Sequence, residues 1–222
     1  MDSLLEKLAL CTERGKVDKD AVYPPDMKGE EGSDELTAKL LADGVDPNRV
    51  LKEGLMVGMN RIGEKFSNHE AFVPDLLMAA RAMNAGMVHL QPYFDSGEAQ
   101  RKGVFVIGTV QGDLHDIGKN LVAMVVEGGG WEVIDLGVNT TAEQFLEEIK
   151  KHPGCVVGLS ALLTTTMVNM EKMVSAIKSA SPDTMVLVGG APLTQEFCEK
   201  IGADNYAQDP QSALNHLAAA SA

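Results

Sequence analysis

The chain has 222 residues, of which 45% are hydrophobic and 23% are charged, so it is an ordinary globular protein with room for two small domains. Its net charge of −13, with no basic stripe, argues against sequence-independent binding to nucleic acid. The first ten residues are amphipathic and charged, and no apolar run approaches the length of a membrane span. We therefore expect a cytoplasmic protein that has no signal peptide and does not enter a membrane.

The first part of the chain carries apolar residues at helical spacing. Four such runs predict four helices, around Leu4–Leu8, Leu36–Leu41, Val50–Ile62 and Leu76–Leu90. Asp46-Pro47 is typical of a helix start, with a capping side chain followed by proline. Three glycines stand where helices are expected to stop: Gly15, Gly44 and Gly63. We predict a four-helix domain over 1–95, joined by a polar linker, 96–102, to the rest of the chain.

From residue 103 the pattern changes to short β-branched runs that alternate with helical ones. This alternation predicts an α/β domain with a parallel sheet over 103–222. The expected strands are Val104–Val110, Trp131–Leu136, Cys155–Ser160, Met185–Val188 and about Asn205–Ala207. The expected helices are Gly118–Glu127, Ala142–Lys151, Thr166–Ala180, Leu193–Ile201 and Pro210–Ala219. Five strand-helix units fit a flavodoxin-like strand order of 2-1-3-4-5, whose ligand crevice lies at the carboxyl ends of strands one and three.

Polar and small residues gather in the loops that leave three of these strands. Asp113 and His115 follow strand one, the run 160–166 follows strand three, and Gly189-Gly190-Ala191-Pro192 follows strand four. A histidine beside a carboxylate suits a metal ligand whose second ring nitrogen is held by that carboxylate. The hydroxyl run offers donors and acceptors, and the bare backbone of the glycines permits close approach of a ligand.

Each of these signals also has an ordinary structural interpretation. A strand-loop junction with Asp and His is often only a turn, Thr164–Thr166 is also typical of a helix cap, and two glycines are typical of a strand-to-helix turn. A zinc hydrolase using His115 with Asp113 and Asp116 lacks a convincing second histidine. Nucleotide binding lacks G-x-G-x-x-G. The three cysteines are far apart and favour buried or inert thiols: Cys11, Cys155 and Cys198.

The three motifs together resemble a known family. D-x-H-x-x-G at 113–118, S-x-L at 160–162 and G-G at 189–190 resemble the cobalamin-binding domain shared by methionine synthase, corrinoid methyltransferase proteins and some mutases. The segments 63–66 and 72–76 look like the helical cap domain that precedes it. The chain is most similar to the small corrinoid proteins of methylamine, methanol and methoxyaromatic methyltransfer systems.

The resemblance assigns roles to individual residues. His115 would replace the benzimidazole of cobalamin as the lower ligand of cobalt, Asp113 would hydrogen-bond it, and Thr166 falls where methionine synthase has a relay serine. Further cofactor contacts are implied at Gly112, Asp116, Ile117, Gly118, Ser160, Leu162, Thr164, Gly189, Gly190 and Ala191. Four cap residues would shield the upper face of the corrin, with core packing as the alternative: Phe66, Phe72, Val73 and Leu76.

The function implied by the resemblance is that of a methyl carrier that is not a complete enzyme. It would bind cobalamin, as methylcobalamin when loaded, and move the methyl group from a substrate-specific methyltransferase, of an O-demethylation or methylamine system, to a second one acting on a folate or thiol. A reductive activase would be a further partner. The Phe66–Phe72 loop and the Asp95–Gly103 linker would be hinges. The alternatives are a cobalamin-dependent sensor and an adenosylcobalamin mutase subunit.

Overall fold

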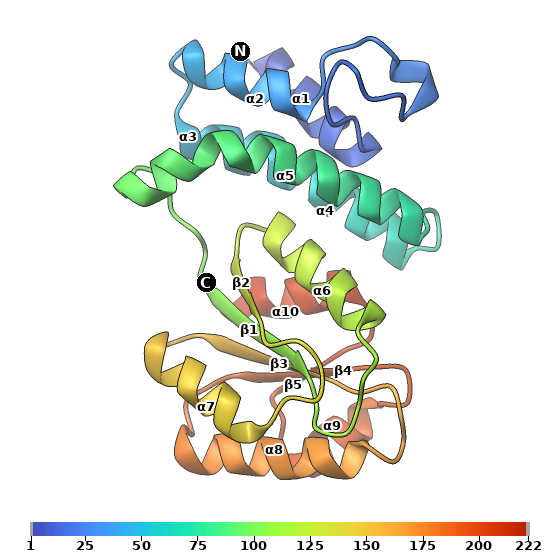
Figure 1. Ribbon diagram of the computed structural model, residues 1–222, viewed down its shortest axis with the longest axis vertical. Helices are drawn as coiled ribbons and strands as arrows, with labels where there is room; N and C mark the ends of the chain where they lie inside the picture. The colour runs from blue at the N-terminus through green and yellow to red at the C-terminus, as the bar shows by residue number, and fades with distance from the viewer. Residues whose placement is uncertain (1, 221–222) are drawn as a thin grey trace. The chain divides into compact units, whose positions relative to one another are not determined.

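The computed structural model describes residues 2–220, and it divides into two compact units (Figure 1). The first unit runs to Arg101 and includes 128–130, and the second contains 102–127 and the chain from Trp131 onward. Residues 1 and 221–222, where the predicted domains begin and end, lie outside the described residues. Within 2–220 no helix is long and apolar enough to cross a membrane.

The first unit is helical, as predicted. Its helices are α1 (Asp2–Arg14), α2 (Ser33–Ala42), α5 (Val73–Ser96) and one rod in which α3 (Pro47–Arg49), a π-helical turn (Val50–Leu55) and α4 (Met56–Ser67) follow one another. A 3-10 turn, Pro25–Met27, lies in the loop before α2. The core of this unit is formed by apolar side chains from all four rods, among them Leu8, Leu36, Leu40, Leu55, Met59, Leu76 and Leu90.

Two of the three predicted helix stops are correct. Gly15 and Gly44 follow α1 and α2 closely and have φ of 71° and 77°, a conformation that favours glycine. Asp46 caps the third rod, because its carboxylate accepts hydrogen bonds from the amides of Asn48 and Arg49. Gly63 was a wrong prediction, since it is buried inside α4. One glycine costs a helix only about 1 kcal/mol, which the packing of the buried face outweighs.

The predicted linker is folded back onto the helical unit. The amide of Asn48 donates to Glu98 O (2.7 Å) and accepts from the backbone N–H of Gln100 (3.2 Å). Between these two residues Ala99 is buried and its N–H donates to Tyr93 O (2.9 Å). One asparagine side chain therefore holds the segment that the sequence suggested as a hinge.

Replacing Asn48 with alanine is expected to release this segment and to speed tryptic cleavage after Arg101 and Lys102. A protease needs several residues in extended form, and two lost hydrogen bonds raise the population of the opened segment about 5- to 20-fold. The measurement is the rate of appearance of the two fragments on a gel. Asn68→Ala, at the exposed end of α4, is the matched control. Equal rates in Asn48→Ala and the native chain would show that Asn48 does not hold the segment.

The second unit contains a sheet whose described strands are all parallel. They are β1 (Val104–Thr109), β2 (Glu132–Asp135), β3 (Val156–Ser160), β4 (Val186–Gly189) and β5 (Asn205–Ala207). Their order is β2-β1-β3-β4-β5, which confirms the predicted flavodoxin-like arrangement. No predicted strand end differs from the observed one by more than one residue.

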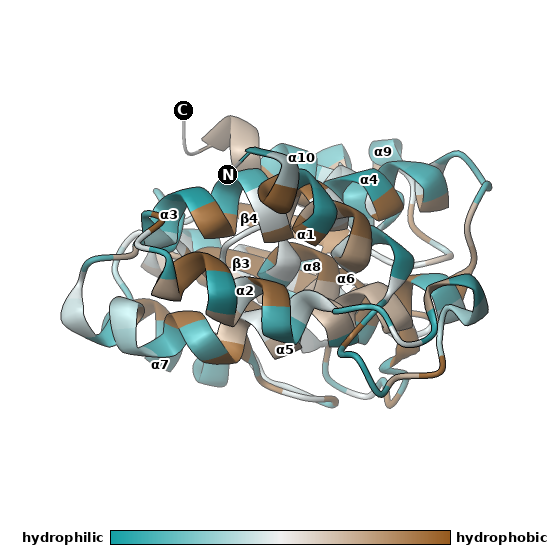
Figure 2. Cartoon of the chain, turned by 90° about the horizontal axis from the view of Figure 1, so that it is seen from above, coloured by the Kyte–Doolittle hydropathy of each residue, from teal (hydrophilic) through white to brown (hydrophobic). Residues whose placement is uncertain are grey.

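Helices cover both faces of this sheet. In Figure 1, α6 (Ile117–Gly128) and α10 (Pro210–Ala220) lie on one face, and α7 (Ala142–Lys151), α8 (Met167–Ala180) and α9 (Gln195–Ile201) lie on the other. The second face holds a core built around Val106, Phe145, Val157, Met170, Val174 and Val188. Figure 2 shows hydrophilic and hydrophobic residues alternating along α2 and α7, as amphipathic helices require.

All three cysteines are free and buried, as expected. Cys11 lies in the helical unit, and Cys155 and Cys198 lie in the sheet unit. Burial raises the pKa of the Cys11 thiol to about 11, so it stays protonated at neutral pH. These residues therefore act as small apolar side chains in the two cores.

Candidate functional site

Three loops meet at the carboxyl ends of β1, β3 and β4. Because β3 lies between β1 and β4 and all three strands are parallel, the loop after β1 lies beside 161–166, which in turn lies beside 190–194. A cavity of about 540 Å³ opens there. Its rim includes predicted site residues: His115, Asp116, Ile117, Gly118, Ser160, Leu162, Gly189, Gly190 and Ala191. Its walls, which the sequence did not indicate, include Phe105, Ile107, Leu121, Val122, Leu187 and the segment 207–210.

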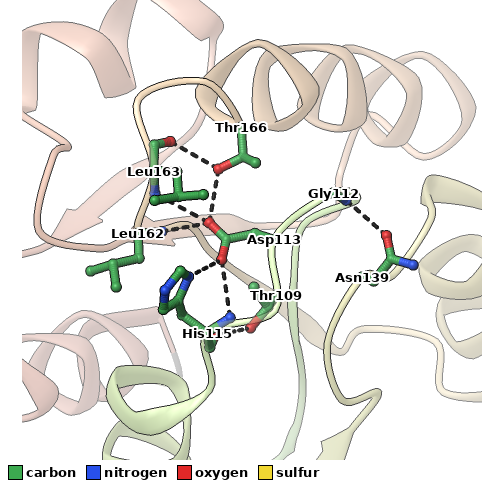
Figure 3. A network of polar contacts seen from close by, with 8 residues as sticks. All are labelled: Thr109, Gly112, Asp113, His115, Asn139, Leu162, Leu163 and Thr166. Carbon is green, nitrogen blue, oxygen red and sulfur yellow. Dashed lines mark hydrogen bonds and ion pairs between the residues drawn. The ribbon is translucent and has the colours of Figure 1, made fainter.

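The carboxylate of Asp113 is the centre of the polar network (Figure 3). It is fully buried. One oxygen, Oδ1, accepts from the backbone N–H (3.1 Å) and the Nδ1 atom (2.7 Å) of His115. The other oxygen, Oδ2, accepts from the amides of Leu162 (2.8 Å) and Leu163 (3.2 Å) and from the hydroxyl of Thr166 (2.8 Å). Asp113 thus ties the loop after β1 to the loop after β3.

The pKa of Asp113 reflects two opposing effects. Burial by itself would raise this pKa, but the hydrogen bonds from the backbone of His115 and Leu162 and from the side chains of His115 and Thr166 outweigh it. The result is a pKa well below the usual range of an aspartate. The carboxylate is therefore ionised at neutral pH and acts only as an acceptor.

An ionised Asp113 determines the tautomer of His115. Since Oδ1 can only accept, Nδ1 of the imidazole carries the proton, and Nε2 keeps its lone pair in the neutral ring. The His115 side chain is 49% exposed and lies at the rim of the cavity. This arrangement presents a basic nitrogen in the form that binds metals.

Thr166 lies behind the rim rather than on it. It is 5% exposed, and its hydroxyl is 2.8 Å from both Asp113 Oδ2 and Leu163 O. A hydroxyl has one proton, so at any moment it donates its hydrogen bond to one of these two acceptors or shares it between them. The structure thus brings together Asp113, His115 and Thr166, and the role of Thr166 in a proton relay stays a prediction.

The glycine pair has a specific steric role. Gly190 has φ of 136°, and a Cβ atom at this position would lie 1.8 Å from Ala161 O. A Cβ on Gly189 would lie 3.1 Å from Ala207 O. Any larger residue at position 190 would collide with the chain after β3, so the close approach of these two loops requires glycine there.

Two predicted contacts lie away from the cavity wall. Gly112 has φ of 86° and donates its N–H to Asn139 Oδ1 (2.8 Å). Thr164 is exposed in the loop before α8. Within the described part of the chain neither residue lines the cavity. Gly112 shapes the turn that carries Asp113, and a direct contact of either residue with a ligand stays a prediction.

The four predicted cap residues all belong to the helical unit. Leu76 is fully buried in the core of that unit, which favours the packing interpretation for this residue. Phe72, which precedes α5, is 68% exposed, and Phe66 and Val73 are partly buried. Their place above a cofactor stays a prediction.

Sequence reasoning missed several residues that support the site. Asn139 holds the loop after β1 twice, through Gly112 and through its own N–H, which donates to Asp113 O (3.0 Å). Lys119 lines the cavity with only 2% of its side chain exposed and is paired with Asp135 and Asn120. In the sequence, Asn139 is marked only by its position shortly after a predicted strand, and Lys119 only by its position directly after the D-x-H-x-x-G motif.

The site fits a metal ion whose other ligands are supplied by a cofactor and not by the protein. Within 2–220 no group of three or more His, Cys, Asp or Glu side chains is placed to hold an ion, so nothing supports the zinc alternative. One histidine beside a largely apolar cavity instead suits cobalt that is already bound by a macrocycle. The residues present therefore fit cobalamin.

Comparison with known proteins agrees with this geometry. A family described as "B12 binding domain" matches residues 103–215, and a second family with the same description matches 29–91. The chain is 40% identical, over 86% of its length and 90% of the relative's, to the trimethylamine corrinoid protein of Methanosarcina barkeri. It is 39% identical to a dimethylamine corrinoid protein of Methanosarcina acetivorans, over 77% of this chain and 81% of the relative.

Two solved structures resemble the whole chain. The methanol:cobalamin methyltransferase complex MtaBC of Methanosarcina barkeri contains a chain with a TM-score of 0.81 and 26% identity, covering 99% of this chain and 80% of that one. A cobalamin-binding protein of Desulfitobacterium hafniense DCB-2 has a TM-score of 0.74 and 28% identity, covering 97% and 98%. The chain therefore belongs to the B12-binding corrinoid proteins of methyltransferase systems, and its cofactor is cobalamin.

Proposed function

We propose that His115 is the lower axial ligand of cobalt in bound cobalamin and that the chain carries methyl groups between two methyltransferases. The observation that supports this role is the 2.7 Å contact between His115 Nδ1 and Asp113 Oδ1, which leaves Nε2 as the basic nitrogen. When bound, cobalamin supplies a cobalt centre that accepts and releases the methyl group.

The protein's own residues tune that centre. Asp113 orients the imidazole and, as a buried anion, raises the electron density on Nε2, so that ligation is favoured. Thr166 and the amides of Leu162 and Leu163 keep Asp113 ionised. The cavity between the sheet and α6 would hold the nucleotide tail and exclude water from it.

We further propose a methylated amine as the source of the methyl group. The relatives described above are named for trimethylamine and dimethylamine, which supports an amine donor over a methoxyaromatic one. An amine-specific methyltransferase would load the carrier, and a second methyltransferase would unload it to a folate or thiol. A reductive activase would restore carrier whose cobalt has become oxidised.

Reconstitution tests the histidine ligand. The purified chain is mixed with hydroxocobalamin and desalted, and bound cobalt and the visible spectrum are compared with those of His115→Ala. We expect stoichiometric cobalt in the native chain and a changed spectrum in the variant. His152→Ala, which alters a histidine beside Glu148 at the end of α7, is the matched control and is expected to match the native chain. Identical spectra for the native chain and His115→Ala would refute the ligation.

The donor is tested separately with the loaded carrier. Methylation is followed after adding a trimethylamine- or dimethylamine-specific methyltransferase with its amine, beside a methanol-specific or methoxyaromatic-specific one with its own substrate. We expect methylation only with an amine system. Methylation only with methanol or a methoxyaromatic donor would overturn the amine proposal and leave the ligation result unaffected.

A further inference from the structure

The backbone of His115 is held by hydrogen bonds to both its N–H and its C=O. Its N–H donates to Asp113 Oδ1 (3.1 Å), and its C=O accepts from the hydroxyl of Thr109 (2.9 Å). Thr109 is the last residue of β1, lies outside the D-x-H-x-x-G motif and is fully buried. Its side chain thus joins the end of the sheet directly to the backbone of the proposed cobalt ligand (Figure 3).

Thr109 is itself fixed by its surroundings. Its N–H donates to Gly137 O (2.9 Å), and its C=O accepts from both the N–H (2.9 Å) and the hydroxyl (2.7 Å) of Thr140. On the other side it is paired in register with Ser160 of β3. Threonine is also stiff at χ1. The hydroxyl of Thr109 is therefore a donor whose position the sheet determines.

The imidazole of His115 needs such support, because about half of its side chain is exposed to solvent. Asp113 holds the ring and the N–H, but these contacts alone leave the peptide between His115 and Asp116 able to turn. The bond from Thr109 removes that freedom. A ligand that is held in place before binding loses less conformational entropy when it coordinates.

We propose that Thr109 is a positioning residue that sets how fully the bound cofactor is ligated by histidine. This inference rests on the ligand role proposed for His115. Removing the hydroxyl, with the shape of the side chain kept, is expected to leave cofactor binding in place and to shift the bound cofactor toward the form without histidine.

The test compares Thr109→Val with Thr109→Ser in protein loaded with cobalamin and reduced to cobalt(II). Electron paramagnetic resonance separates the two forms, because an axial nitrogen splits the cobalt lines and isotopic labelling of histidine identifies its source. One hydrogen bond of ordinary strength predicts a fall of about tenfold in the ratio of ligated to unligated form in Thr109→Val. Thr109→Ser, which keeps the donor, is expected to stay within about twofold of the native ratio.

Thr12→Val controls for a purely structural effect. Thr12 is also fully buried and donates its hydroxyl to a backbone carbonyl, Leu8 O (3.0 Å), but it lies in α1. It is expected to lower the melting temperature without moving the ratio. A native ratio in folded Thr109→Val would overturn the inference, and so would an equal shift in Thr12→Val.

Two further variants keep the test decisive. If Thr109→Val does not fold, Thr140→Val removes the hydroxyl that fixes the Thr109 carbonyl and is expected to lower the ratio about threefold, since it acts one bond further away. An unchanged ratio there would overturn the inference.

His115→Ala distinguishes a failure of the ligand proposal from a failure of the Thr109 proposal. If His115→Ala retains the histidine splitting, His115 is not the ligand. If His115→Ala loses the splitting and Thr109→Val keeps the native ratio, only the role of Thr109 is refuted.

Discussion

Replacing Asp113 with asparagine is expected to destabilise the sheet unit by about 2–4 kcal/mol and to weaken histidine ligation. The carboxylate accepts five hydrogen bonds in a fully buried position. An asparagine side chain has one carbonyl oxygen and one NH2 group. The NH2 group would face either the His115 donors or the donors of the loop after β3, so those buried donors would lose their acceptor.

The measurements are urea unfolding of the apo protein and the cobalt(II)/cobalt(I) potential of the loaded protein. Histidine ligation stabilises the more oxidised form, so a weaker ligand is expected to make this potential less negative. Asp183→Asn, at an exposed position before β4, is the control for the loss of one charge in the same unit. Equal potentials in the native chain and Asp113→Asn would count against Asp113 as the group that tunes His115.

Replacing Gly190 with alanine is expected to prevent the retention of cobalamin and to destabilise the protein by about 3 kcal/mol or more. The new Cβ would lie 1.8 Å from Ala161 O, and backbone atoms cannot give way as a side-chain tip does. The loops after β3 and β4 must then separate, which distorts the rim of the cavity at Ala161, Gly190 and Ala191.

Gly154→Ala is the matched control because it separates steric collision from backbone strain. Gly154 has φ of 83°, but a Cβ there would meet nothing within 4 Å. It is expected to cost only about 1 kcal/mol and to retain stoichiometric cobalt. Cobalt content after desalting and the urea midpoint decide the result. Retention of cobalamin by Gly190→Ala at the native level would show that the two loops are free to separate without loss of the site.

Elements built from local patterns were predictable. The four helical rods follow from apolar residues at helical spacing, and the five strands follow from β-branched runs bounded by turns. Asp46 as a helix cap needed only its own neighbours. Gly63 was mistaken for a helix end because a glycine signal is local, whereas the buried face of α4 that overrides it is made by contacts with other helices.

The candidate site was only partly predictable for the same reason. The motif placed His115 beside Asp113, two positions away in the chain. The three other donors to Asp113 come from residues 49 to 53 positions later. The family resemblance singled out Leu162 and Thr166 among them, but it did not indicate Leu163 or the hydrogen bonds that the backbone amides donate. Asn139, Lys119 and the apolar cavity walls were missed because each is positioned by a neighbouring element rather than by its own segment.

Local sequence patterns were enough to predict the two-part α/β organisation, the strand order and the loops that carry the ligand chemistry, because periodicity and turn residues act over a few positions. The contacts that support this chemistry became visible only in the folded chain. Asn48 holds the segment before β1, Gly190 permits two loops to touch, and Thr109 fixes the His115 peptide. Each of these contacts joins residues whose proximity is created by packing, and a hydrogen bond or a steric limit exists only once packing has brought its two partners together.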